Sequence, residues 1–527
     1  MFANLLFYFQ SEPKIGSVTM AKQGRESAIA LNFGNGEATK LHFQSSYPDS
    51  EIVIGLVAAV GTDLEHVARE IVERLKAFRY NSKEIKISRD IIPVLRKTKN
   101  HTDHFARIDN LMSTGNRLRK DSGENSILAL AAAASINEFR IKASSGAHPA
   151  AFKKQAFIIS SLKHPDEVEQ LRKIYSNGFF LIGIHSTEER RTELLTKRKF
   201  ISEDKAKLLI QRDQEENEPF GQHTRDTYHL SDFFVNLQGN LDKFQNDIWR
   251  VIDLIFGKPF VTPTFDEFAM FMAFSSSLRS ADLSRQVGAV IAKNKNIIST
   301  GANDVPKSGG GLYWPHYDQN NTKIEDEQGG RDYMRGGDTN VLEKNAIISD
   351  ILERASDSTK RELKKLLKSS KIKNITEYGR AVHAEMEALL ACGRSKVGTV
   401  GATLYSTTYP CHNCAKHIIA AGIKRVVYVE PYPKSKAYEF HSDSLSHNDS
   451  NKVLFEPFVG VGPRSFFNLF SMNLGSGYKI LRKLGNGNIV DWKESTSSPR
   501  MKLTPSSYIE REQLAAVSVL NCLEKLK

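Results

Sequence analysis

The chain has 527 residues, which is long enough for two or three domains, each with its own hydrophobic core. Its composition, 40% hydrophobic and 25% charged, is that of a globular protein, and no apolar run approaches the length of a membrane span. The four cysteines favour a reducing compartment, so we expect a cytoplasmic protein with no membrane partner. The formal charge of +12 suits anionic partners such as nucleotides or a nucleic acid, or else only solvates the surface.

Residues 1–48 carry little patterning, and we expect a leader there whose structure the sequence does not define. A clearer segment begins with the buried-strand pattern Ile52–Val57. It leads through a glycine turn into an amphipathic helix that starts at Leu64. Strand, glycine turn and helix form the layout of a phosphate-binding loop, in which amides at the helix N-terminus hold an anion.

The candidate nucleotide-binding residues of this loop are Gly55, Gly61 and Thr62. The full motif is G-x-x-x-x-G-K-[ST]. With Thr62 as the final hydroxyl, Gly61 stands where lysine is expected, and no lysine follows before Lys76. We therefore expect a site for a nucleotide effector without phosphoryl transfer, and a purely structural turn remains the alternative.

Two further buried-strand patterns, Ala156–Leu162 and Phe179–Ile184, enclose a helical stretch. Strands that alternate with helices predict a parallel sheet. The segments Ile108–Arg119 and Glu188–Arg191 are expected to add arginines on loops. Together, residues 49–258 resemble a nucleoside-monophosphate-kinase-like fold with an altered phosphate loop.

The C-terminal half begins with Phe265–Leu278, an apolar stretch that predicts a core helix. A strand follows at Ile297–Asn303, where Gly301 would permit a turn and Asn303 would present an amide at its edge. A polar loop over 315–339 and a lysine-rich helical insertion over 340–370 come next.

Two short motifs carry the chemistry. The first is His383-Ala384-Glu385 at the start of a helical stretch, and the second is Pro410-Cys411-His412-Asn413-Cys414. A catalytic zinc site takes three protein ligands and leaves a fourth position for water. His383, Cys411 and Cys414 are ligands of the right kind, and Glu385 would move protons between water and a leaving amine. The order H-x-E then P-C-x-x-C is the signature of zinc-dependent base deaminases.

Weaker explanations of these motifs are a structural zinc site or a redox pair of cysteines. A structural zinc site needs four ligands, and the other two cysteines are poorly placed to supply the fourth. Cys392 would lie on the far side of the helix that carries Glu385, where we expect a core thiol, and Cys522 lies near the C-terminus. The catalytic zinc site is the prediction, with Zn²⁺ as cofactor.

Arg279-Ser280-x-Asp282, Arg285–Ala289 and Gly301-x-Asn303, followed by the two metal motifs, resemble deoxycytidylate deaminases over residues 259–475. Their fusion to the N-terminal segment resembles the bacterial anti-phage deoxycytidylate deaminases. The resemblance implies an α/β protein with an N-terminal P-loop kinase-like domain, a C-terminal α/β/α cytidine-deaminase-like domain and an extension over 476–527. The long insertion between Tyr313 and Tyr378 departs from the family pattern.

The same resemblance implies deamination of deoxycytidine nucleotides, dCMP or dCTP, which would starve an infecting phage of dCTP. It gives Asn303 a contact with the sugar, Arg279 a place near the phosphate end, and Ala384 a backbone contact with the base. It also implies an inhibitory small non-coding RNA as a partner, and we expect a homo-oligomer. The competing hypotheses are a polynucleotide deaminase acting on cytosine or adenine, and a non-enzymatic nucleotide- or RNA-binding regulator.

Overall fold

A computed structural model describes residues 49–525 apart from 99–100, 145–148, 215, 217–218, 238, 371, 373–374, 376, 431–434, 476 and 504. The leader expected over residues 1–48 lies outside the described residues. The chain divides into two compact units. The first unit comprises Met1–Leu230, Leu237–Val261 and Ser471–Lys527, and the second comprises Ser231–Asn236 and Thr262–Phe470.

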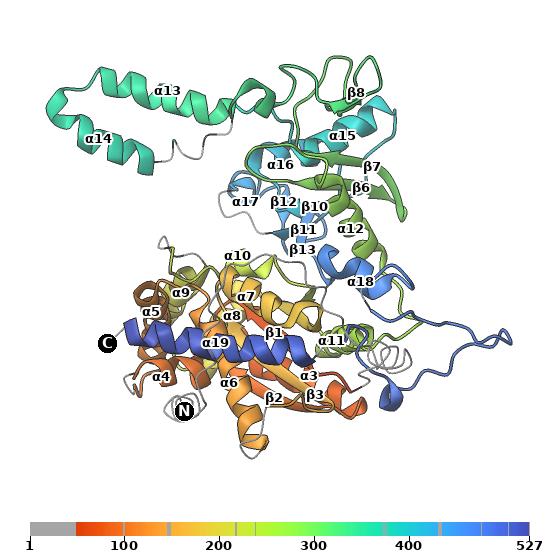
Figure 1. Ribbon diagram of the computed structural model, residues 1–527. Coiled ribbons are helices and arrows are strands. Elements are labelled where there is room, and N and C mark those ends of the chain that lie inside the picture. The colour runs from red at the N-terminus through yellow and green to blue at the C-terminus, as the bar shows by residue number, and fades with distance from the viewer. Residues whose placement is uncertain are drawn as a thin grey trace, which may run out of the picture. The chain divides into compact units, whose positions relative to one another are not determined.

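The first unit is built on a parallel sheet (Figure 1). Strand β1, Ile52–Ala58, lies between β3, Gln155–Leu162, and β4, Phe179–His185, and β2, Asn81–Lys86, follows at the outer side of β3. All residues of β1 are buried, because both faces of a parallel sheet are covered by helices. The three long strand predictions of this unit are confirmed, and so is its parallel pairing.

Helices surround this sheet: α3 Leu64–Ala77, α4 Ile92–Leu95, α5 His104–Ser122, α6 Ile127–Ala143, α7 Pro165–Tyr175, α8 Glu188–Glu193, α9 Glu203–Gln214, α10 Thr224–Tyr228, α11 Leu241–Ile255 and α19 Pro505–Lys525. The prediction that Ile108–Arg119 and Glu188–Arg191 are loops was wrong, because both segments are helical. Each of these two helices begins with an N-cap residue, which the loop prediction did not take into account. The Asp103 carboxylate accepts from the amide of Ala106, and Thr187 accepts from Arg190.

The C-terminal helix α19 packs against α6 in the first unit (Figure 1). A fully buried guanidinium joins the two, since Arg140 of α6 binds Glu512 of α19 at 2.7 Å and Glu51 at 2.6 Å. The hydroxyl group of Tyr508 also donates a hydrogen bond to Glu51. The last 20 or so residues of the described chain are therefore part of the core of the first unit and not an appendage.

The second unit contains a six-stranded sheet in the order β12-β13-β11-β10-β6-β7. Its strands are β6 Gly288–Lys293, β7 Asn296–Ala302, β10 Thr403–Thr408, β11 Arg425–Glu430, β12 Leu445–Ser446 and β13 Val453–Pro457. Strands β10, β11 and β13 are parallel, whereas β6 runs antiparallel to both β10 and β7. The predicted strand–helix–strand unit around the cysteine motif is confirmed as β10, α16 His412–Ala420 and β11.

Helices cover both faces of this sheet. On one face, α15 Ala384–Arg394 and α16 share a core with Ala289, Ile291 and Leu404. On the other face, α12 Phe265–Ser277 meets Tyr405, whose hydroxyl donates to Asp266 at 2.5 Å. Side chains of successive strand residues point to opposite faces, so Leu404 and Tyr405 separate the two helix layers. The α/β class with parallel pairing is confirmed.

Gly301 does not form the turn that was expected, because it lies inside β7. A Cβ atom at this position would lie 2.1 Å from the carbonyl oxygen of Ala384, at the start of α15. The glycine is required here because the strand and the helix that carries the metal motif approach at backbone contact distance.

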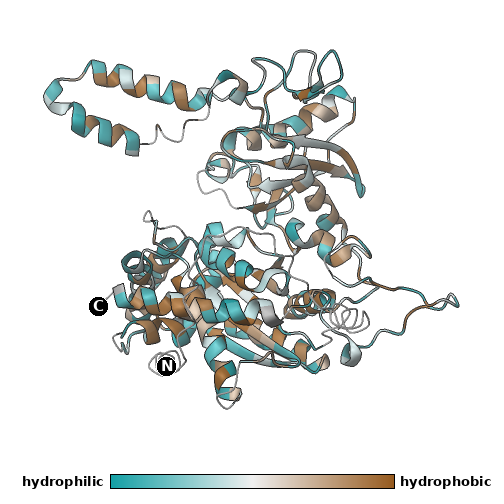
Figure 2. Ribbon diagram, in the orientation of Figure 1, coloured by the Kyte–Doolittle hydropathy of each residue, from teal (hydrophilic) through white to brown (hydrophobic). Residues whose placement is uncertain are grey.

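The insertion consists of β8 His316–Tyr317, β9 Ile324–Glu325, α13 Thr339–Glu353 and α14 Asp357–Ser369, so its predicted helices are confirmed. None of the residues of α13 and α14, all of them described, is buried. Figure 2 shows hydrophobic and hydrophilic residues interspersed along both helices. In the described part of the chain we find no helix with the length and apolar character needed to cross a bilayer.

Candidate active site

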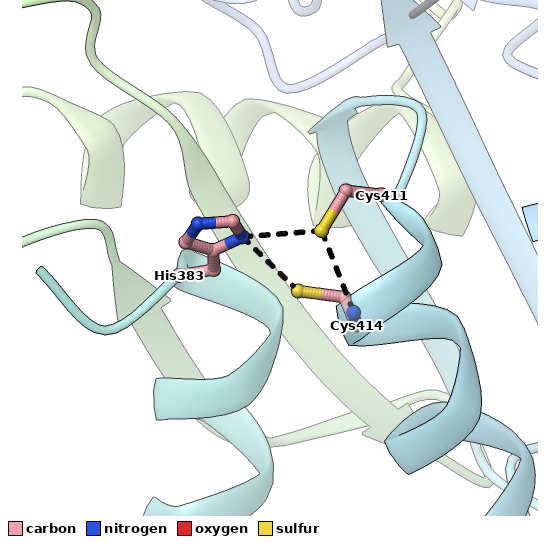
Figure 3. A group of neighbouring side chains, drawn as sticks. All are labelled: His383, Cys411 and Cys414. Atoms are coloured by element: carbon pink, nitrogen blue, oxygen red, sulfur yellow. Dashed lines mark hydrogen bonds between the residues drawn. The ribbon is translucent and has the colours of Figure 1, made fainter. Parts of the chain in front are cut away.

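Three side chains of the second unit converge at the starts of two helices (Figure 3). His383 and Cys411 are the residues before α15 and α16, and Cys414 lies in the first turn of α16. The Nδ1 atom of His383 lies 3.3 Å from Cys411 Sγ and 3.4 Å from Cys414 Sγ. The structure thus brings the three predicted metal ligands together.

The local sequence explains this arrangement. His383 and Cys411 are both N-cap residues with extended backbone conformations, so each side chain points across the mouth of its own helix. The amide of Cys414 donates to the sulfur of Cys411 at 3.5 Å, which holds the two sulfurs near each other. Helix α16 ends before Gly422, whose φ of 72° closes the turn into β11.

The donor set fits a zinc ion. One imidazole nitrogen and two sulfurs lie within 4.8 Å of one another in the described chain. A tetrahedral zinc ion with bonds of about 2.0–2.3 Å separates its ligand atoms by about 3.5–3.8 Å, so small adjustments of the side chains suffice. Three protein ligands leave the fourth position of a tetrahedral site for water, as in catalytic zinc sites.

The electrostatics favour the metal-binding form of one cysteine. Hydrogen bonds with Cys414 and His383 lower the pKa of Cys411 to about 4, so its thiolate is the stable form at neutral pH. The hydrogen bond with Cys411 raises the pKa of His383 to about 9. Metal binding at this nitrogen must therefore displace a proton.

Glu385 lies beside the three ligands and is only 4% exposed. Its Oε2 atom is 3.5 Å from Cys414 Sγ. Burial raises the pKa of its carboxyl group above the ordinary value, because the charged form loses its hydration. A carboxyl group with a raised pKa can both accept and deliver a proton near neutral pH.

A cavity of about 230 Å³ opens onto this cluster. The predicted residues His383, Ala384, Glu385, Cys411 and Asn303 all line it. The additional polar lining residues are Asp282, Ser284, Arg285, Asp332, Asp338, Asn340, Arg380, Thr408, Tyr409 and His412.

Asn303 uses its side chain to shape the cavity wall. Its Oδ1 accepts from the amide of Val287 at 2.6 Å, and its Nδ2 donates to the carbonyl of Arg285 at 2.8 Å. The amide therefore fixes the segment that carries Arg285. The second lone pair on Oδ1 can accept a hydrogen bond from a ligand hydroxyl.

Arg279 is not among the residues that line the cavity. Its guanidinium lies 3.6 Å from the centre of the Trp314 ring and donates to the carbonyl of Tyr313 at 2.6 Å. The arginines that do line the cavity are Arg285 and Arg380. Arg380 binds Asp332 at 2.8 Å, which ties the insertion to the cavity wall.

Sequence reasoning missed the contribution of the insertion to this cavity. Asp332, Asp338 and Asn340 precede His383 by more than forty positions, and no local pattern connects them with the metal motif. Tyr409 could have been found, because it directly precedes the P-C-x-x-C motif at the end of a predicted strand.

In the first unit, Gly61 and Thr62 line a separate cavity of about 290 Å³. Gly61 has a φ of 86°, a conformation that glycine adopts without strain. Gly55 lies inside β1, where a Cβ atom would lie 2.7 Å from the Phe179 ring, and it does not line this cavity. The structure therefore brings together two of the three residues predicted for the nucleotide loop.

Comparison with known proteins gives a consistent result for the second unit. A family model described as the cytidine and deoxycytidylate deaminase zinc-binding region matches residues 263–430. The deoxycytidylate deaminase of Enterobacteria phage T2 is 33% identical over 165 residues, which cover 31% of this chain and 79% of that protein. That of phage T4 is 33% identical over 171 residues, covering 31% and 77%.

The deoxycytidylate deaminase of Saccharomyces cerevisiae is 26% identical over 276 residues, covering 51% of this chain and 73% of the yeast protein. The matched family region contains the three ligand residues and Glu385. The chain is a hydrolytic deaminase with a zinc site, and it belongs to the deoxycytidylate deaminase family.

Proposed function

We propose that the chain deaminates free deoxycytidine nucleotides, dCMP or dCTP, to deoxyuridine nucleotides. The observation that carries this proposal is the buried carboxyl group of Glu385 beside a His-Cys-Cys cluster at one cavity. A structural zinc site has no use for a buried carboxyl group at an open ligand position. The deoxycytidylate deaminases of phages T2 and T4 support the choice of substrate.

His383, Cys411 and Cys414 would hold the zinc ion. When bound, zinc lowers the pKa of water and so supplies a nucleophile at neutral pH. Glu385 takes one proton of the attacking water and passes it to N3 of cytosine, where it remains in the uracil product. It then takes the second proton, from the hydroxyl group added at C4, and delivers it to the amine, which leaves as ammonia. The buried position of Glu385 keeps this proton away from bulk water.

The cavity supplies groups for the rest of the nucleotide. We assign the phosphate to Arg285 or Arg380, the arginines among the lining residues. Asn303 holds the backbone beside Arg285 and offers its Oδ1 to the sugar, and the backbone of Ala384 faces the base. Arg279 contacts Tyr313 and Trp314, and its expected place near the phosphate end stays a prediction.

The test is a parallel assay of the purified, zinc-loaded chain with dCMP, dCTP, CTP and a cytosine-containing single-stranded oligonucleotide. We expect uracil products from at least one deoxynucleotide and little conversion of the oligonucleotide. Oligonucleotide conversion as fast as the best mononucleotide would replace this proposal with the polynucleotide deaminase.

For the first unit we propose a P-loop kinase-like fold that binds a nucleotide effector without phosphoryl transfer. A parallel sheet with a glycine turn at the carboxyl end of its central strand supports this proposal. The missing lysine at Gly61 removes the charge that phosphoryl transfer requires.

We further propose, from the sequence resemblance alone, that the enzyme lowers dCTP in anti-phage defence under the control of a small inhibitory RNA. The same resemblance supports a cytoplasmic homo-oligomer. Its functional division would be 49–258 for the nucleotide domain and 259–475 for the deaminase domain, flanked by 1–48 and 476–527.

A further inference from the structure

The cavity beside Gly61 has the size and the charge to hold a nucleotide. Its volume of about 290 Å³ exceeds the 230 Å³ of the deaminase cavity. Six cationic side chains line it, namely Lys86, Arg107, Arg119, Lys163, Arg198 and Lys199. Three carboxylates of the wall oppose them, namely Asp63, Glu65 and Asp213, and Glu167 behind the wall pairs with Arg119. The remaining excess of positive charge around the cavity favours an anionic ligand.

The cavity wall carries both polar and apolar groups. The Thr62 hydroxyl and Arg119 Nε are buried and have no hydrogen-bond partner among the described residues. Arg119 is 1% exposed. Leu111, Met112 and Leu128 are apolar residues of the same wall. A nucleoside phosphate offers an anionic group and an apolar base face to a wall of this mixed character.

The anion position of the glycine turn already holds a carboxylate of the chain itself. Asp213, which is 0% exposed, accepts from the amide of Val60 at 2.8 Å. Its other oxygen accepts from Nζ of Lys163 at 2.7 Å, and Lys163 also donates to the carbonyl of Ala58 at the end of β1. A loop amide and a lysine are the groups that bind phosphate in nucleotide loops.

We infer that this cavity takes a nucleoside phosphate, and that Asp213 is an internal competitor that occupies the phosphate position until the ligand displaces it. This inference rests on the nucleotide binding proposed above for the first unit. A phosphate cannot share the Val60 amide and Lys163 with a buried carboxylate, because two anions in contact repel each other. Ligand binding must therefore move Asp213 out of the turn.

Asp213 belongs to α9, so its displacement would move this helix. Ala206, Leu209 and Ile210 of α9 share a small cluster with Met112 and Leu195, two residues that line the cavity. This satellite cluster is small and separate from the main core of the unit. Two ion pairs to other elements also hold α9, Asp213 with Lys163 and Arg212 with Asp109. A helix with so few attachments is an element that a ligand can shift at modest cost.

The first experiment measures nucleotide binding to the full-length chain carrying Glu385→Ala, so that no ligand is consumed. The probes are ATP, GTP, dTTP and dCTP in equilibrium dialysis, and the three nucleotides without cytosine report on the first unit. We expect Asp213→Asn to tighten binding at least tenfold, because it removes the competing charge. The matched control is Asp204→Asn, since Asp204 is an exposed carboxylate on the same helix. Equal nucleotide affinities of Asp213→Asn and Asp204→Asn would show that Asp213 does not compete with the ligand.

The double variant Asp213→Asn/Lys163→Met should bind nucleotide more weakly than Asp213→Asn alone, because it lacks the cation that would bind the phosphate. If no variant, including Asp213→Asn, binds a nucleotide beyond the deaminase site, then the proposed nucleotide binding itself is wrong. Deamination is measured separately, on chains that retain Glu385, so a failure of nucleotide binding in the first unit would leave the proposed deaminase function standing.

A second experiment uses the chain without any substitution in the first unit, so it does not depend on the folding of a variant. Hydrogen exchange at saturating nucleotide should slow at residues 59–64 and accelerate several-fold in α9. Slower exchange at the turn with unchanged exchange in α9 would show that the ligand binds without displacing Asp213.

Discussion

At the scale of single residues, Glu385 and Glu387 differ although both lie in the first turn of α15. Glu385 faces the metal cluster, whereas Glu387 forms an ion pair with Arg394 on the same helix. We predict that Glu385→Gln lowers the deamination rate by about 10²–10⁴-fold, because proton transfer is lost. Zinc content, measured by elemental analysis, should not change. The control Glu387→Gln should retain most of the ammonia release, and a comparable loss there would contradict the assignment.

The cysteines offer a second comparison at this scale. Cys414→Ala removes one of three protein ligands, so we expect loss of zinc and a lower melting temperature. Cys392→Ala removes a buried thiol that packs in the same core but lies outside the metal cluster. That variant should keep a zinc ion in each chain. Unchanged metal content in Cys414→Ala would rule out the ligand set.

At the scale of elements, the contact between β7 and α15 sets the position of the metal motif. Gly301→Ala places a methyl group against the carbonyl of Ala384, so the helix start that carries His383 must shift. Overpacking of this kind costs about 1–3 kcal/mol, and we expect lower zinc content together with lower activity. In Gly393→Ala the new methyl group meets no atom within 4 Å, and it should stabilise α15 by about 0.5–1 kcal/mol. Normal zinc content in Gly301→Ala would show that the backbone contact is not decisive.

The docking of α19 on α6 should depend on pH. Burial raises the pKa of Glu512 to about 7, although Arg140 opposes the shift, and Glu51 adds a second carboxylate to the same cluster. A carboxyl group with a raised pKa binds its proton more tightly in the folded state. The contribution of this proton to the free energy of unfolding is therefore complete below about pH 4.5. It is lost as the pH rises through about 7, a change of about 3 kcal/mol.

Chemical unfolding of the parent chain and of Glu512→Gln at pH 5 and pH 8 measures this contribution. The parent should lose stability relative to the variant at pH 8, since the glutamine cannot ionise. A stability difference that is the same at both pH values would contradict the raised pKa.

At the scale of the whole molecule, each unit has its own core and its own cavity. The cavity of the first unit lacks the loop lysine, and Lys163, which contacts the end of β1, is bound to Asp213. We predict no release of phosphate from ATP or GTP above the buffer background. Nucleotide hydrolysis that persists in Glu385→Gln would show that the first unit is itself a catalyst.

The sequence by itself located the three residues of the metal cluster, the proposed proton carrier Glu385, and the strands and helices that hold them. Short motifs sufficed here because His383 and Glu385 share one helix start, and Cys411 and Cys414 share another. Strand β1 and helix α3 were equally predictable, since hydrophobic periodicity is a local signal. The N-caps Asp103 and Thr187 are residue types that favour a helix start, so the sequence also predicts helices after them. The loop predictions for these segments ignored that signal.

Only the tertiary structure decided which distant residues complete each cavity. Arg380 and Asp332 meet at the deaminase cavity across an insertion of helices, and Asp213 reaches the glycine turn from about 150 positions away. The sequence around Gly301 suggested a turn, because a glycine is common in turns. Its close contact with Ala384 depends on the packing of α15 against β7, which the sequence of the strand does not reveal. The physical reason is the same in each case: periodicity and motifs report on neighbours along the chain, whereas charge pairing and backbone contact depend on how the elements pack.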